Sequence, residues 1–205
     1  NRDLLRVDEA ELRGLRSRIA KEGWGKALLE MRRDDGHWGN GVYNPKWTCT
    51  HYVLFELAQL GIEPDNAKCR ESVSLLLDFP AGKDGGFNYA RTVEYSDACI
   101  NGMILNITSY FGINDTRVRC VVDFLMNIRM ADGGWNCEYC RGARKSSLHT
   151  TISILEGISR FLKLGDPYRN RELEVARSRG IEFIMKHELY KTSTTGEIIK
   201  DEFLK

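Results

Sequence analysis

Apolar and polar positions follow one another in a recurring order along most of the chain. Three segments are apolar on nearly every side, and each is followed by a segment with one apolar stripe and one charged face. The first kind covers residues 46–60, 96–111 and 147–163, and the second covers 65–79, 115–130 and 170–187. At a helical period, the first kind predicts buried inner helices and the second predicts an outer layer. A further helical pair is expected near residues 8–32.

A short turn motif precedes each apolar segment. The pattern D-G-x-[WF]-[GN] begins at Asp35, Asp84 and Asp132, at intervals of 49 and 48 residues. Glycine tolerates a positive φ, so the motif allows the chain to leave an outer helix tightly. We expect the aromatic residue to pack back over the neighbouring helices as a structural residue. A loop, an inner helix and an outer helix repeating about every 48 residues predict a curved double layer of helices.

Composition narrows the class of protein. The chain has 205 residues, 42% hydrophobic and 29% charged residues, and a net charge of +1. These values are typical of a globular protein, and they do not favour a nucleic-acid partner. No apolar run approaches the roughly 18–20 residues of a membrane span. Six cysteines at irregular spacing favour a reducing cytoplasm over a secreted disulfide framework.

We expect one all-α domain over residues 1–205. The chain begins at Asn1 and ends in DEFLK without a closing helix, which favours a fragment with further helices on its C-terminal side. The last repeat of such a fragment lacks a neighbour, so one apolar flank is expected to be uncovered. Its residues are Ile152, Ile154, Leu155, Ile158, Ile184 and Leu189.

With these turns and the apolar helices that follow them, residues 21–190 resemble the superfamily of squalene/hopene cyclases and protein prenyltransferase β subunits. The resemblance implies an α/α toroid, here a partial ring, with inner helices around a deep apolar cavity. It also implies a prenyltransferase-like or terpenoid cyclase-like enzyme acting on an isoprenoid or another apolar chain. A non-catalytic toroid that binds a lipid-like ligand or a protein partner is the alternative.

A zinc site is implied by the same resemblance. Prenyltransferases bind zinc through an Asp-x-Cys pair at the start of one inner helix and a His at the start of the next. Asp97 and Cys99 match the pair, and His149 follows Cys99 by 50 residues. Three protein ligands would leave one zinc position open for catalysis. The structural alternative makes Asp97 a helix N-cap, Cys99 a buried apolar residue and His149 a polar residue at a helix start.

The residues for an anionic substrate match the family only in part. Arg91 stands six residues before Asp97, where the family has an arginine, but Glu94 replaces a lysine. A carboxylate beside a diphosphate is unfavourable by Coulomb's law. Arg144, in a basic loop, is a second candidate for anion contacts, unless that loop is simply solvated. The acidic motif of the cyclases has only Asp97 as a counterpart, without a second carboxylate to raise its acidity.

Residues 131–151 form the joint between the second outer helix and the third inner helix, and they contain a CxxC pair. Cys137 and Cys140 are a weak zinc signal on their own, because a second pair is missing. No strand pattern precedes them, which disfavours a thioredoxin-like role. They remain the fallback metal site, together with His149 and Cys99, and such a site would be closed and structural.

Overall fold

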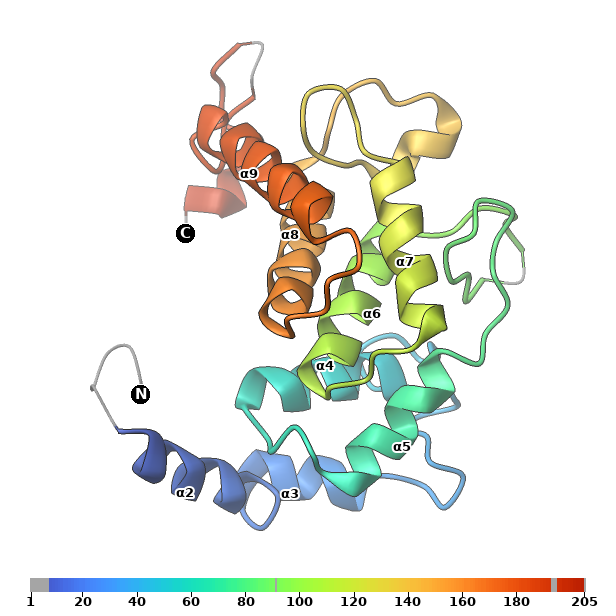
Figure 1. Cartoon of the computed structure of the whole chain (residues 1–205), viewed down its shortest axis with the longest axis vertical. Coiled ribbons are helices and arrows are strands. Elements are labelled where there is room, and N and C mark those ends of the chain that lie inside the picture. Colours follow the sequence, from blue (N-terminus) through green and yellow to red (C-terminus); the bar gives the residue numbers. More distant parts are fainter. Residues whose placement is uncertain (1–7, 91, 193–194, 205) are drawn as a thin grey trace. The chain divides into compact units, whose positions relative to one another are not determined.

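The fold is helical throughout the part of the chain that is described. The structure is a computed structural model that describes residues 8–90, 92–192 and 195–204 (Figure 1). Within these ranges it contains α-helices, two 3-10 helices and two isolated β-bridges, and no β-strand. The prediction of an all-α protein is therefore confirmed.

The helices lie close to the ranges that periodicity predicts. The α-helices are α2 (Glu9–Ile19), α3 (Gly23–Glu30), α4 (Thr50–Leu60), α5 (Ala67–Leu76), α6 (Ala98–Tyr110), α7 (Thr116–Asn127), α8 (Leu148–Lys163) and α9 (Asn170–Lys186). The 3-10 helices are η1 (Cys137–Arg141) and η2 (Asp201–Leu204). The largest difference is at α4, which begins four residues later than expected. Trp47 has a φ of +78°, in the left-handed region, and a right-handed helix cannot include such a residue.

The chain divides into two compact units. The first comprises residues 1–79 and 110–113, and the second comprises 80–109 and 114–205. In the first unit, α4 packs against α5 and also against α3. Leu54 and Leu57 of α4 have no exposed surface, nor do Val73 and Leu76 of α5. These side chains form the core of the first unit.

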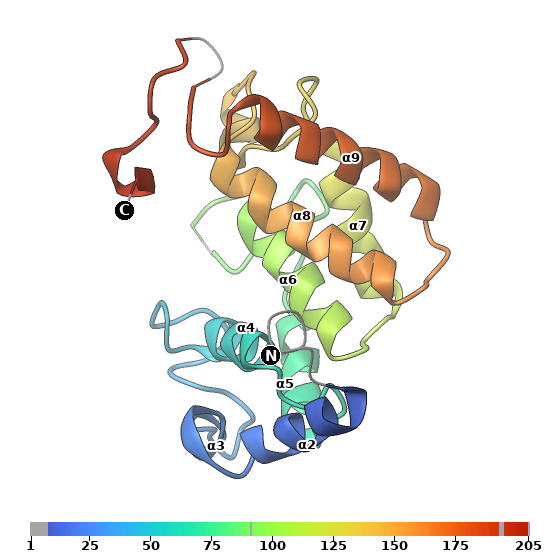
Figure 2. The ribbon, with the colours of Figure 1, turned by 90° about the vertical axis from the view of Figure 1, so that its left-hand side faces the viewer.

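In the second unit, α8 and α9 lie side by side and run in opposite directions (Figures 1 and 2). Helix α6 packs so closely against α8 that a Cβ atom at Gly157 would lie only 2.4 Å from the carbonyl oxygen of Gly102. The absence of a side chain at Gly157 allows this approach. Only Cys99, Met103 and Tyr110 of α6 are not fully buried. Helix α7 has a single buried stripe, and so has α9. This difference in burial is the one that the sequence pattern predicts.

The three turn motifs have the same backbone hydrogen bonds. In each motif the backbone N–H two positions before the aspartate donates a hydrogen bond of 2.8–2.9 Å. The acceptor is the backbone carbonyl oxygen of the residue immediately before the aromatic residue. The first glycine donates back across the turn in each motif, at 3.0–3.1 Å. These glycines, Gly36, Gly85 and Gly133, have φ values of +83°, +85° and +103°. The left-handed backbone explains why glycine stands at this position.

The aromatic residue of each turn is hydrogen bonded to the helix that follows the turn. The amide of Trp38 donates to Thr50 Oγ1 at 3.0 Å, and the amide of Trp135 donates to Thr151 Oγ1 at 3.0 Å. Phe87 makes the equivalent bond to Asn101 Oδ1 at 2.8 Å. All three aromatic side chains are buried. The prediction that they are structural residues is therefore confirmed.

The expected apolar flank is exposed only at its edges. Ile152 is 44% exposed and Leu189 is 61% exposed. Ile154, Ile158 and Ile184 are buried, contrary to the prediction. Ile184 lies in one cluster with Phe183, and Leu155 of α8 packs against that cluster. The prediction is wrong for these residues because neighbouring helices cover them: Ile154 lies against Gly102 of α6, and Ile184 packs in the cluster between α8 and α9.

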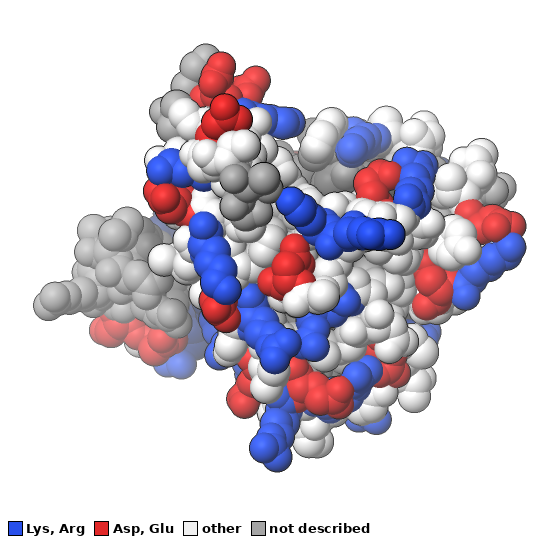
Figure 3. Space-filling model, turned by 90° about the horizontal axis from the view of Figure 1, so that it is seen from above, with Lys and Arg blue, Asp and Glu red and all other residues white. Residues whose placement is uncertain are grey.

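Charges of both signs are mixed on the face of the molecule in Figure 3. Ion pairs between residues close in the sequence include Arg169 with Glu172 and Lys186 with Glu182. Among the described residues, none of the helices has the length and apolar character that crossing a membrane requires.

Candidate metal and thiol site

Asp97 stands directly before α6 and caps it. Its Oδ1 atom accepts hydrogen bonds from the backbone amides of Cys99, at 2.9 Å, and Ile100, at 3.2 Å. These amides belong to the first turn of the helix, whose N–H groups have no partner within the helix. The structural role considered for Asp97 is therefore present. The carboxylate is also exposed, so it remains accessible to a ligand.

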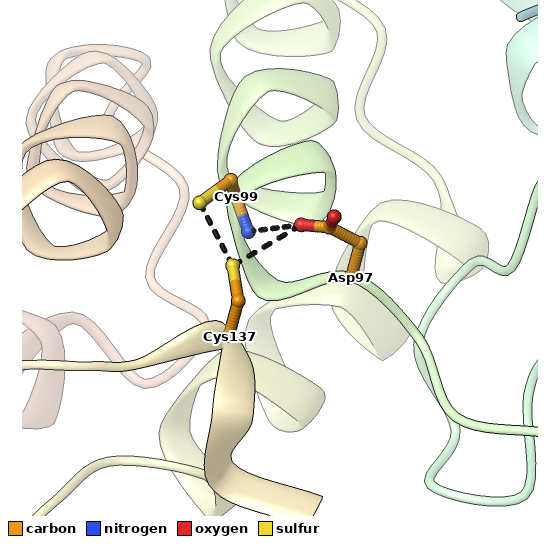
Figure 4. A group of neighbouring side chains, drawn as sticks. All are labelled: Asp97, Cys99 and Cys137. Carbon is orange, nitrogen blue, oxygen red and sulfur yellow. Dashed lines mark hydrogen bonds between the residues drawn. The ribbon is translucent and has the colours of Figure 1, made fainter. Parts of the chain in front are cut away.

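Two cysteines from separate segments meet beside this carboxylate (Figure 4). Cys99 lies in the first turn of α6, and Cys137 is the first residue of η1. Their Sγ atoms are 2.9 Å apart, and Cys137 Sγ lies 3.3 Å from Asp97 Oδ1. The ligand atoms of all three residues lie within 4.8 Å of one another. Both cysteines are half-buried.

Polar contacts from two other segments hold the pair in place. Thr150, in the first turn of α8, has its Oγ1 atom 3.4 Å from Cys99 Sγ and 3.5 Å from Cys137 Sγ. Tyr139, two residues after Cys137, donates its hydroxyl to the Asp84 carboxylate and approaches the Ser96 carbonyl oxygen at 3.0 Å. Asp84 belongs to the second turn motif. The turn thus anchors η1 next to the residue that caps α6.

The same contacts change the acidity of several groups. The hydrogen bond from Cys137 lowers the pKa of the Cys99 thiol, and its effect outweighs that of burial. The pKa of the Cys137 thiol is raised, first by its hydrogen bond to Cys99 and then by burial. Burial raises the pKa of Tyr139, and the bond to Asp84 adds to the effect. The hydrogen bond between the two thiols therefore favours ionisation of one sulfur while the other keeps its proton, and a thiolate is the form that binds metals and reacts with oxidants.

A pocket of about 400 Å³ borders Cys137 and Asp97. Residues 93–97 form one wall and η1 forms the other. Three carboxylates lie in this lining, from Glu94, Asp97 and Glu138, and Arg141 is the basic residue among them. Arg141 forms an ion pair with Glu138 at 3.1 Å. The charge of the described lining residues is therefore acidic on balance.

The predicted metal ligands are brought together in part. Asp97 and Cys99 are neighbours, and Cys137, expected only as a fallback ligand, completes the group. His149 is exposed in the first turn of α8 and is not a member of this group. Cys140, near the C-terminal end of η1, is exposed and lines the pocket together with Cys137, but it is not a member of the ligand group.

Of the two predicted anion contacts, only Arg144 lies among the described residues. Arg91 lies outside the described residues. Arg144 is exposed in the loop after η1, and it is not part of the pocket lining. Glu94, which stands where the family has a lysine, forms an ion pair with Lys83 at 2.7 Å.

Sequence reasoning missed the supporting residues. Tyr139 and Thr150 were not candidates, because a tyrosine in a loop and a threonine at a helix start are common without any functional role. One signal was available for Thr150. Thr50 and Thr151 occupy similar positions in the first turns of α4 and α8 and serve the turn motifs there. Because Thr151 already makes the hydrogen bond to the turn motif, the second threonine, Thr150, is not needed for that bond, and this was the signal for a separate role.

The donor set fits a thiophilic metal ion such as zinc. Zinc takes Cys sulfur at about 2.3 Å and carboxylate oxygen at about 2.0–2.2 Å, so tetrahedral ligands stand roughly 3.6–3.8 Å apart. The observed contacts of Cys137 Sγ, 2.9 Å to Cys99 Sγ and 3.3 Å to Asp97 Oδ1, are shorter by less than about 1 Å. A small outward movement of the three ligand side chains would make room for the ion. The same two thiols, without a metal, are also close enough for thiol oxidation chemistry.

Comparisons of the chain with protein-family models, with curated proteins and with solved structures found no match.

Proposed function

We propose that this chain is part of a prenyltransferase- or squalene cyclase-like α/α toroid that binds an isoprenoid or another apolar chain. In this proposal, Asp97, Cys99 and Cys137 hold a zinc ion at the rim of the ring. The observation that carries it is the meeting of Cys99 and Cys137, with Sγ atoms 2.9 Å apart beside the Asp97 carboxylate.

The toroid part of the proposal is supported by three features of the helices. Helix α6 is buried on nearly all sides, as an inner helix of a ring would be. The contact between Gly102 and Gly157 brings α6 and α8 together as consecutive inner helices would pack. The three turns with equal hydrogen bonds support a repeating unit of turn, inner helix and outer helix.

The zinc part of the proposal is supported by the ligand chemistry. Two thiols and one carboxylate are ordinary zinc ligands, and a site with three protein ligands keeps one position open. A zinc ion in such a site acts as a Lewis acid and lowers the pKa of the group bound at the open position. Thr150 and the amides of α6 would position the ligands, since they already hydrogen bond to Cys99, Cys137 and Asp97.

The acidic pocket favours an uncharged apolar ligand over a diphosphate. Glu94 and Glu138 line the pocket beside Asp97, and a diphosphate there would meet like charges. Arg141, the basic residue among the described lining residues, is already paired with Glu138. This observation favours the second candidate function, a non-catalytic toroid that binds a lipid-like molecule.

Metal analysis of the purified protein tests the zinc part of the proposal. We expect one zinc per chain by plasma mass spectrometry, and a loss of zinc in Cys99→Ser. Cys120→Ser is the matched control, since Cys120 is an exposed cysteine on α7. Equal zinc contents in Cys99→Ser and the wild type would contradict the site.

Calorimetry with farnesol and farnesyl diphosphate tests the ligand. We expect farnesol to bind at least as tightly as the diphosphate, because of the acidic lining. A strong preference for the diphosphate would favour a transferase instead. Binding of farnesol without any product would favour the non-catalytic alternative.

A further inference from the structure

Cys99 and Cys137 are the closest pair of thiols in the described part of the chain. Their sulfur atoms, 2.9 Å apart, lie nearer than two non-bonded sulfurs normally approach. A disulfide has a sulfur–sulfur distance of about 2.05 Å, so bond formation requires a movement of less than about 1 Å. The two residues are 38 positions apart in the sequence, and the fold alone brings them together.

The neighbouring pocket gives solvent access to Cys137, one member of this pair. Cys99 and Cys137 are half-buried, and Cys137 lines the pocket of about 400 Å³. Cys49 and Cys69, by contrast, are buried. A small oxidant therefore has access to Cys137 without any opening of the fold.

The surroundings hold the thiols in a fixed relation. Thr150 Oγ1 contacts both sulfur atoms, and Tyr139 ties η1 to Asp84 and Ser96. Cys99 is fixed because its amide bonds to the residue that caps α6. A pair that is already aligned reacts faster than two cysteines that must first find one another.

We propose that Cys99 and Cys137 form a reversible redox modification site, in which a hydroperoxide oxidises the two thiols to a disulfide. One sulfur attacks the peroxide oxygen, which breaks the O–O bond, gives a sulfenic acid and releases water or an alcohol. The second thiol then attacks the sulfur of the sulfenic acid. The S–S bond forms, the S–O bond breaks, and the hydroxyl group leaves as water with the proton of the second thiol. Two thiol hydrogens and two electrons pass to the peroxide. A dithiol reductant reverses the change by thiol–disulfide exchange.

If the zinc site of the proposed function is present, oxidation of the two thiols also regulates zinc binding. A zinc ion needs Cys99 and Cys137 as thiolates, and a disulfide offers neither. Oxidation would therefore release the ion, and bound zinc would protect the thiols. The disulfide itself does not depend on the presence of a metal.

Titration of the full chain with hydrogen peroxide tests the inference. We expect peptide mapping without reduction to find Cys99 linked to Cys137, and a dithiol to restore both thiols. Cys137→Ala should stop at the sulfenic acid of Cys99, which a dimedone adduct traps, and circular dichroism checks that this variant is folded. Cys140→Ser should leave the linkage unchanged.

Two arms separate this inference from the proposed function. In protein stripped of metal by a chelator, the linkage is expected at substoichiometric peroxide, before Cys120 is oxidised. Failure there, or a link from Cys137 to Cys140 instead, overturns the redox site whatever the metal result. In zinc-loaded protein, oxidation should be at least tenfold slower and should release zinc. A linkage that forms at the same rate with and without zinc would keep the redox site and count against the metal site.

Discussion

A Cβ atom placed on Gly157 would lie 2.4 Å from the carbonyl oxygen of Gly102. This contact brings the backbones of α8 and α6 together, and no other residue type fits without a shift of one helix. The site depends on it, because Thr150 of α8 and Cys99 of α6 lie near the same ends of the two helices.

Gly157→Ala should therefore destabilise the protein by about 1–3 kcal/mol, the usual cost of overpacking a close contact. Gly14→Ala is the control, since nothing lies within 4 Å of the added carbon at that exposed position of α2. Alanine suits a helix interior better than glycine, so the control should gain about 0.5–1 kcal/mol. Urea unfolding followed by circular dichroism measures both. Equal effects of the two changes would refute the close packing.

Substitutions at Asp97 separate capping from metal binding. Asn caps a helix about as well as Asp but lacks the charge, so Asp97→Asn should keep the stability and bind zinc more weakly. Asp97→Ala should lose zinc affinity and, in addition, about 1 kcal/mol of stability. Zinc titration and urea unfolding of the two variants give the comparison. Wild-type zinc affinity in Asp97→Asn would mean that Asp97 only caps α6.

Cys137 and His149 compete for the role of third zinc ligand. Cys137 belongs to the group of close ligand atoms and His149 does not, so Cys137→Ala should weaken zinc binding by more than about 100-fold. The loss in His149→Ala should be clearly smaller. Competition with a zinc-sensitive dye measures both affinities. The reverse order would support the ligand set that the resemblance implies.

Oxidation of Cys99 and Cys137 should also stabilise the fold. A link between residues 38 positions apart reduces the entropy of the unfolded chain, and the chain-entropy relation gives about 3–4 kcal/mol. Peroxide-treated protein should therefore unfold at higher urea concentration than the same sample after reduction. In Cys137→Ala, peroxide should have no such effect. An unchanged midpoint in the wild type would show that the link strains the native state.

Stability should fall as the pH is lowered below neutrality, because of His51. Burial lowers the pKa of this side chain on α4 from 6.5 to about 3. Between these values the unfolded chain binds a proton that the folded chain does not, so acid favours unfolding. The effect is absent above pH 6.5 and grows as the pH falls toward about 3.

Urea midpoints at pH 7, 6 and 5 in wild type and His51→Leu measure this dependence. The wild type should lose stability over this range, and the variant should lose less. His149→Gln, a change at an exposed histidine, should follow the wild type. A parallel decline in wild type and His51→Leu would exclude His51 as the cause.

Helix positions were predictable because they depend on local periodicity. The stripe of α9 at Leu173, Ala176, Gly180 and Ile184 follows the helical repeat, and the same stripe is buried in the structure. The turn motifs were predictable for a similar reason. Gly85 and Gly133 adopt a backbone that side chains disfavour, so the residue type alone indicates the conformation. The burial of Ile154 and Ile158 was not predictable, since it depends on how α8 packs against its neighbours, where Ile154 lies against Gly102 of α6.

The sequence by itself determined that Asp97 and Cys99 share a helix start, because two residues on one turn are neighbours whatever the rest of the chain does. It made His149 the expected next ligand and left Cys137 and Cys140 as the fallback, because the resemblance places a histidine at the start of the following inner helix. Only the tertiary structure decided among them. The path of η1 depends on the bonds of Tyr139 to Asp84 and Ser96, which join residues 55 and 43 positions apart. Contacts over such distances have no local signature, and they place the Cys137 sulfur against Cys99 while His149 remains at the surface.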